Sequence, residues 1–251
     1  MNKSPITRIA LAIALSASTG YAFANPPSLS KVNGSLTAEA GRTYADIDTV
    51  NGSINLLSKA IARDVETVNG SITLDAGAKA ENVSTVNGKI LLRDGVSARS
   101  VETVNGAIIG VSNIRLQHSV EAVNGSIEIG ARSTIGRDVE TVNGSIKLLS
   151  TKVDGHVETV NGNILIGDKT MVGRYLAVRK PTGWGINWGK PRIPRIILGP
   201  NSVVNGDLIF EREVELYVHE TAKYGKIVYT LSGKPASLKP VVFSGKEPDL
   251  N

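Results

Sequence analysis

One position of this chain, recurring at a nearly constant interval, is acidic in six repeats and Ser in two, an arrangement from which a row of cation sites could be built. We call this set the carboxylate column: Ser30, Asp48, Glu66, Ser84, Glu102, Glu121, Glu140 and Glu158. Stacked carboxylate oxygens could coordinate calcium ions. They could equally form a solvated surface neutralised by the nearby Arg63, Arg99, Arg137 and Arg174. We favour the solvated surface, because no repeat contains the clustered Asp-x-Asp-Gly ligands of a calcium loop.

Catalytic groups are sparse. Cysteine is absent, which excludes thiol catalysis and thiolate metal sites. His118, His156 and His219 fall in no metal-ligand spacing, and the chain has no phosphate loop, G-x-S-x-G or paired-His motif. We therefore expect no catalytic residue, no metal and no cofactor. A glycan-active enzyme is the alternative, because β-helices can carry acid–base groups on one face.

A basic segment with two tryptophans is the other chemically distinct feature. Residues 176–195 contain five basic residues and no acidic one, together with three prolines and three glycines, which do not form a regular strand. Tryptophan interleaved with Lys and Arg suits stacking combined with phosphate or sugar-acid contact. The alternative is that both rings cap an open end of the molecule. The candidate interaction residues are Arg179, Lys180, Trp184, Trp188, Lys190, Arg192 and Arg195.

The elements that must position these groups follow from a repeat. Between Leu29 and Tyr175, Val-Asn-Gly occurs eight times at spacings of 18 or 19 residues, and Leu or Ile always follows one residue later. A fixed short period predicts a repeat architecture. The asparagines of the repeat are Asn33, Asn51, Asn69, Asn87, Asn105, Asn124, Asn143 and Asn161.

Asn-Gly between alternating runs is also a strong signal for a β-hairpin, so a meander must be weighed. No Phe, Tyr or Trp occurs from Ala45 to Arg174, as expected for the narrow interior of a solenoid. We therefore predict an all-β, single-stranded parallel β-helix of about 18 residues per coil, with eight regular coils and about two irregular ones. Identical residues would then lie about 4.8 Å apart.

Each repeat position receives a structural role in this prediction. We expect the asparagines to form a ladder that satisfies buried polar groups, and the glycines to supply a positive φ at the corner. Val and Ile should form the core. The Thr that precedes most Val-Asn-Gly motifs either faces inward or, in the less favoured alternative, forms an exposed ice-binding array.

The chain is divided into five segments. Residues 1–24 resemble a signal peptide, with Lys3 and Arg8, an apolar run and the small-x-small site ending at Ala24. We expect the regular solenoid over 25–178, the Trp-containing loop over 179–195, irregular coils over 196–230 with a ninth Val-Asn-Gly at 204–206, and a flexible tail over 231–251. No segment of the mature chain is apolar enough to cross a membrane, so a periplasmic or secreted protein is expected.

The repeated TVNGSI and VETVNGSIKL segments resemble a bacterial putative-adhesin family whose members repeat a similar unit in a β-solenoid. The stretch IILGPNSVVNGDLIF is similar to the polymer-forming bactofilins, which are cytoplasmic and also β-helical. The first resemblance covers about 150 residues and implies the fold more firmly than the role. Neither family carries catalytic residues that could be transferred to this chain.

Together these features predict a non-enzymatic solenoid with a structural or adhesin-like role in the bacterial cell envelope. Expected partners are an envelope glycan, lipopolysaccharide or another protein, whereas nucleic acid is not expected. Besides a glycan-active enzyme, a self-assembling, polymer-forming protein is the remaining alternative.

Overall fold

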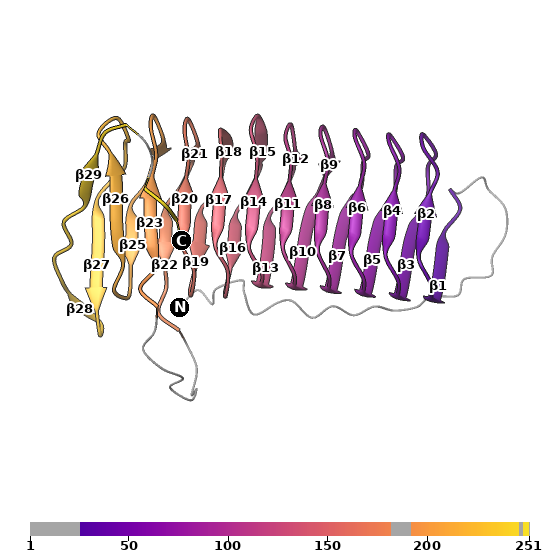
Figure 1. Ribbon diagram of the computed structural model, residues 1–251, viewed down its shortest axis with the longest axis horizontal. Helices are drawn as coiled ribbons and strands as arrows, with labels where there is room; N and C mark the ends of the chain where they lie inside the picture. The colour runs from indigo at the N-terminus through magenta and orange to yellow at the C-terminus, as the bar shows by residue number, and fades with distance from the viewer. Residues whose placement is uncertain (1–25, 182–191, 246–247, 251) are drawn as a thin grey trace.

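The computed structural model describes residues 26–181, 192–245 and 248–250. The expected signal peptide, Trp184, Trp188 and Lys190 lie outside these residues. The described chain winds into an elongated β-solenoid of about eleven turns with roughly 18 residues per coil (Figure 1). The predicted fold class is therefore confirmed. In the described residues no helix is present that could cross a membrane.

Sheet A forms one face of the rod and has twelve strands. They are β1 (Leu29–Asn33), β3 (Asp46–Asn51), β5 (Asp64–Asn69), β7 (Asn82–Asn87), β10 (Ser100–Asn105), β13 (Val120–Asn124), β16 (Val139–Thr141), β19 (Val157–Thr159), β22 (Leu176–Val178), β25 (Leu208–Phe210), β27 (Ile227–Leu231) and β28 (Lys234–Pro235). All pair in parallel except β27 with β28, which are antiparallel.

Sheet B contributes eleven parallel strands, one to each turn. They are β2 (Leu36–Ala38), β4 (Ile54–Leu56), β6 (Ile72–Leu74), β8 (Ile90–Leu92), β11 (Ile108–Gly110), β14 (Ile127–Ile129), β17 (Ile146–Leu148), β20 (Ile164–Ile166), β23 (Arg195–Leu198), β26 (Glu215–His219) and β29 (Val241–Phe243). The smaller sheet C consists of β9 (Ser97–Ala98), β12 (Arg115–Leu116), β15 (Ser133–Ile135), β18 (Thr151–Val153), β21 (Met171–Val172) and β24 (Val203–Val204).

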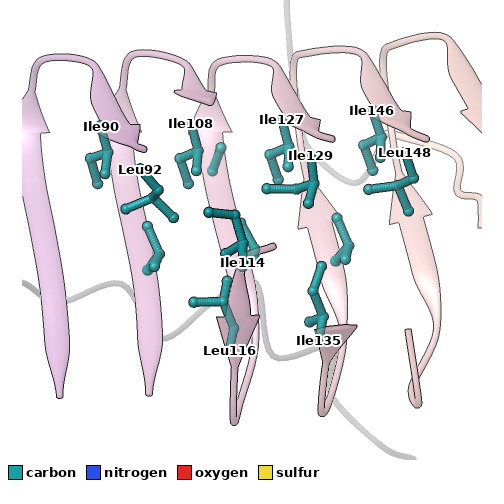
Figure 2. Packing of buried hydrophobic residues seen from close by; sticks show 14 of the residues in the cluster. Ile90, Leu92, Ile108, Ile114, Leu116, Ile127, Ile129, Ile135, Ile146 and Leu148 are labelled. Carbon is teal, nitrogen blue, oxygen red and sulfur yellow. The ribbon is translucent and has the colours of Figure 1, made fainter. Parts of the chain in front are cut away.

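The core is a column of aliphatic side chains along the axis of the rod. Alternate residues of each strand point inward, so Ile127 of β14 stacks between Ile108 of β11 and Ile146 of β17, and Ile129 stacks on Leu148 of β17 (Figure 2). The narrow cross-section accepts Ile, Leu, Val and Ala in successive turns, and each residue packs on its counterpart in the next coil.

The threonine before the repeat motif belongs to this core. Thr67 and Thr85 are fully or almost fully buried, and their hydroxyls donate to the carbonyls of Gly52 and Gly70 in the preceding turn, both at 2.9 Å. The Val that follows lies on the opposite side of the strand and is half-buried, as at Val68 and Val86. The threonines therefore form no exposed ice-binding array, and the motif valine is not the core residue we expected.

The asparagines hydrogen-bond along the rod on its surface. Each Nδ2 donates to the Oδ1 of the asparagine one turn earlier at 2.8–2.9 Å, from Asn51 on Asn33 through Asn161 on Asn143. We call this row the asparagine ladder. Its side chains are exposed, so the expectation that it satisfies buried groups is wrong.

The motif glycine also has a different role from the expected one. Of the motif glycines, Gly34 has a positive φ, of 112°, whereas Gly52 and its successors do not. Instead, the turns approach so closely at this corner that a Cβ on Gly125 would lie 1.7 Å from the carbonyl oxygen of Gly106. Glycine is required there by close contact between backbones, not by its freedom at φ.

The regular corner is first interrupted between β22 and β23. Residues 179–194 connect these strands at the place where earlier turns have Val-Asn-Gly. The rod then continues through β25, β26, β27 and β29 (Figure 1), so the described stems of the Trp-containing loop leave the rod before its last turns. The Val-Asn-Gly at 204–206 begins at the last residue of β24 and precedes β25, so it occupies a different corner from the eight others.

The C-terminal segment is more ordered than the flexible tail expected from the sequence. In it, β29 pairs in parallel with β26 in sheet B. The backbone carbonyl of Leu250 accepts a 2.7 Å hydrogen bond from Asn163 Nδ2, so the end of the chain returns to the side of the rod. Prolines and lysines made this segment look disordered, but edge pairing needs only a few free backbone groups.

Candidate functional site

The carboxylate column lies on the outer face of sheet A. Parallel pairing places Glu102, Glu121, Glu140 and Glu158 in direct register in successive turns. Residues two positions earlier in each turn share that face, because side chains alternate along a strand. In the three turns from β16 to β22 those residues are Asp138, His156 and Tyr175.

His156 lies between two carboxylates. Its Nδ1 is 2.7 Å from Asp138 Oδ1, and its Nε2 is 2.7 Å from Glu140 Oε1. The side chains of His156 and Glu140 are only 8% and 3% exposed, whereas that of Asp138 is 22% exposed. The backbone N–H of His156 also donates to Asp138 Oδ1 at 2.9 Å. This buried cluster joins side chains from two consecutive turns.

Tyr175 and Arg179 continue the cluster toward the Trp-containing loop. The ring of Tyr175 stacks on His156 with centroids 4.4 Å apart and an interplanar angle of 13°. Arg179 Nε binds Glu158 Oε2 and its Nη1 binds Glu211 Oε1, both at 2.9 Å. The guanidinium carbon lies 5.6 Å from the Tyr175 ring centroid, within the range of a cation–π contact.

Burial and neighbouring charges shift the titration of these groups. Burial opposes the cationic form of His156, but the adjacent carboxylates of Asp138 and Glu140 outweigh it and raise its pKa to about 9. Burial, with the charges of Glu102 and Glu140, raises the pKa of Glu121 to about 7. His156 is therefore a cation near neutral pH and not a free general base, which requires a pKa near the working pH.

Arginines also fix the two stems of the Trp-containing loop. Arg212 donates to Asn161 Oδ1, at the end of the asparagine ladder, and its other donors bind the carbonyls of Val160 and Arg192 at 3.0 Å. It therefore occupies the position of the asparagine that the interrupted turn lacks. On the same stem, the Arg195 N–H donates to Asn163 Oδ1 at 2.9 Å.

The structure assigns different roles to the candidate loop residues. Arg179 and Arg195 are engaged in ion pairs, with Glu158 and Glu211 and with Glu215 respectively. Lys180 and Arg192 are exposed at the two stems. Trp184, Trp188 and Lys190 are outside the described residues, so their placement stays a prediction.

The expected neutralisation of the carboxylate column by arginines is not what the structure has. Arg63 pairs with Asp46 and Asp64, which lie in the outward position two residues before the column. Arg99 and Arg137 lie close enough to His118 for their charges to lower its pKa, after the larger effect of desolvation. The repulsion among the stacked carboxylates is offset chiefly at the C-terminal end of the column, where His156 pairs with Glu140 and Arg179 pairs with Glu158.

Sequence reasoning missed the Asp138–Glu140–His156 cluster. Histidine spacing was compared with local metal motifs, whereas the useful spacing is the period of the solenoid itself. Asp138 and His156 are 18 residues apart and Tyr175 is 19 further on, so the three stack in successive turns. An alignment of the repeats that included the residue before the first strand position would have placed them together.

Comparisons with family models, with curated proteins and with solved structures give no match.

Proposed function

We propose that this chain is a non-enzymatic β-solenoid of the bacterial cell envelope, periplasmic or secreted after cleavage near Ala24, with a structural or adhesin-like role. Its contact element would be the Trp-containing loop. The signal-like N-terminus and the resemblance of the repeats to a putative-adhesin family support this location and role. The expected ligand is an acidic envelope glycan or lipopolysaccharide, with another protein as the alternative.

One observation carries the proposal: the loop leaves the rod at a corner whose two stems are tied down on both sides. Arg179 links the first stem to Glu158 and Glu211, and Arg212 binds the carbonyl of Arg192 on the second stem. The solenoid continues beyond the loop. A loop that served only to cap the end of the rod would lie at its last turn. It would not need further turns beyond it, or stems held by ion pairs between turns.

The chemistry of the loop favours an anionic, ring-containing ligand. With Arg179 and Arg195 in ion pairs, the cations available at the stems are Lys180 and Arg192. Lys190 and the two tryptophans add charge and stacking surfaces in the intervening sequence. Phosphates of lipopolysaccharide or acidic sugars would meet the cations, and sugar rings would stack on indole.

Alanine substitution of Trp184 and Trp188 together tests this proposal. Binding to lipopolysaccharide vesicles and to peptidoglycan should fall at least tenfold, while the melting temperature changes little. Replacing Lys190 and Arg192 by Glu should weaken binding similarly, and Lys59→Glu with Lys79→Glu, on another corner of the rod, is the charge-matched control. Unchanged binding together with a large loss of melting temperature would make the loop a structural cover.

Self-assembly is the second candidate, favoured by apolar side chains at the last turn. Val241 and Val242 of β29 are 55% and 64% exposed, and Val228 of β27 is 41% exposed. An apolar edge of this kind can pair with another chain. Light scattering over a wide concentration range decides the matter, since a monomer at every concentration would exclude filaments.

A further inference from the structure

We propose that Asp138, Glu140 and His156 form a binding site for a first-row divalent cation such as Zn²⁺, on the outer face of sheet A. Their donor atoms all lie within 4.8 Å of one another. One imidazole nitrogen with two carboxylates is a donor set that such ions accept. The site would be additional to the Trp-containing loop and independent of any ligand bound there.

An unsatisfied polar atom is the second observation that points to a cation. Glu140 Oε2 is buried and has no hydrogen-bond partner, whereas both ring nitrogens of His156 face carboxylates at 2.7 Å. A buried polar atom left unpaired destabilises the fold. A metal ion would accept the free lone pair of Glu140 and would displace a proton from His156, because metal and proton compete for the same imidazole nitrogen.

The local charge also favours a cation. Glu121 and Glu158 stand in register on either side of Glu140, so three carboxylates stack in successive turns. The guanidinium of Arg179 is shared between Glu158 and Glu211, and the charge of Arg174 acts on Asp138. Like charges stacked in adjacent strands repel, and a divalent ion at the centre of the row would offset the repulsion more than His156 does.

Access and rigidity fit a site of this kind. Asp138 is 22% exposed and provides a route from solvent, whereas Glu140 and His156 are held by the sheet. The stacked ring of Tyr175 fixes the plane of the imidazole. The ligands come from β16, from the residue before it and from the residue before β19, elements whose register is set by backbone pairing.

Zn²⁺ titrated into the untagged, EDTA-treated protein tests the site by calorimetry. One ion per chain should bind with a dissociation constant in the micromolar range or below, and the melting temperature should rise. Asp138→Asn, Glu140→Gln and His156→Gln should each weaken binding at least tenfold. Asp64→Asn, which changes an outward carboxylate of the same sheet in a turn without histidine, is the matched control and should bind like the unaltered protein.

Bound Co²⁺ provides a readout that a purely structural role would not alter. Visible absorption bands should appear with the unaltered protein and with Asp64→Asn, and be lost in Asp138→Asn, whose partly exposed position allows it to fold. Circular dichroism verifies the fold of each variant. Absence of Zn²⁺ binding at millimolar concentration, or equal binding by the three ligand variants, would overturn the proposal.

Discussion

At the scale of single residues, each residue of the Val-Asn-Gly motif has a different structural role. The asparagine joins the turns on the surface, the glycine allows their backbones to touch, and the valine is half-buried. The threonine just before the motif closes the corner from inside through its bond to a glycine carbonyl. The two polar side chains therefore stabilise the same corner from opposite sides.

Gly106→Ala should be among the most destabilising substitutions in the rod. Its Cβ would lie 1.9 Å from the carbonyl oxygen of Gly88, which cannot move without disturbing the ladder. We expect a loss of at least about 3 kcal/mol in urea unfolding. Asn105→Ala should lose only about 1 kcal/mol, because its partners can turn to water. Equal losses would contradict this division of roles.

Glu121→Gln tests the strain in the carboxylate column. A folded pKa of about 7 lies above the ordinary value of 4.5, so the native state binds the proton more tightly. The destabilisation is absent below about pH 4.5, grows as pH rises and is complete above about pH 7. In metal-free buffer the variant should therefore gain about 1 to 3 kcal/mol at pH 8 and little at pH 4.5.

A control for Glu121→Gln is available on the surface. Glu39 pairs with Arg42 where both side chains are about two-thirds exposed, and exposed pairs contribute little. Thermal unfolding of Glu39→Gln should show no comparable difference between pH 4.5 and pH 8. A Glu121→Gln profile parallel to that of the unaltered protein would show that the column is not strained.

At the scale of elements, the corner between sheets A and B determines where the rod can accept an insertion. Regular turns close this corner with the Val-Asn-Gly motif and one further residue, whereas the interrupted turn has residues 179–194 there. Arg212 supplies donors that the missing motif would have provided. A long side chain from the following turn therefore compensates for a missing asparagine.

Arg212→Met tests this compensation while keeping most of the aliphatic stem. The carbonyls of Val160 and Arg192 lose their donor, and we expect a loss of about 1 to 3 kcal/mol. Amide hydrogen exchange should rise at residues 160–163 and 192–195 and stay unchanged at 46–110. Arg93→Met, which removes an ion pair to Asp75 on a regular turn, should have a much smaller effect.

The sequence predicts the repeated elements well because their information is local and periodic. The period of Asn105 and Asn124 locates the ladder, and alternation locates the strands. The Asp138–Glu140–His156 cluster could not be found from any single repeat, since its members come from two turns and only His156 breaks the pattern. Strand β29 was missed because its pairing depends on a neighbour in the fold and not on its own composition.

At the scale of the whole molecule, strand pairing joins each turn only to its neighbours, so stability should vary along the rod. The last turn has the fewest strand pairings. Its strand β29 pairs only with β26, where Tyr217 lies opposite Val241 and His219 opposite Phe243. The preceding turns are held on both sides. The C-terminal end should therefore open at lower free energy than the centre.

Deleting residues 241–251 should unfold the end of the rod without unfolding its middle. The variant loses the β26 pairing and the bond from Asn163 to Leu250. Hydrogen-exchange protection should fall over residues 208–231 and persist over 46–110, and circular dichroism should retain most of the β signal. Loss of protection throughout the rod would show that it unfolds as one unit.

The asparagine ladder has a direction. Every amide donates toward the N-terminal turn and accepts from the C-terminal one, so the side-chain dipoles add head to tail, as backbone dipoles do in a helix. Unsatisfied donor character collects at Asn33 and acceptor character at Asn161, where the guanidinium of Arg212 is placed. Because aligned hydrogen bonds polarise one another, the row carries a net dipole along the rod. The negative end of this dipole is bound by the Arg212 guanidinium at the base of the Trp-containing loop.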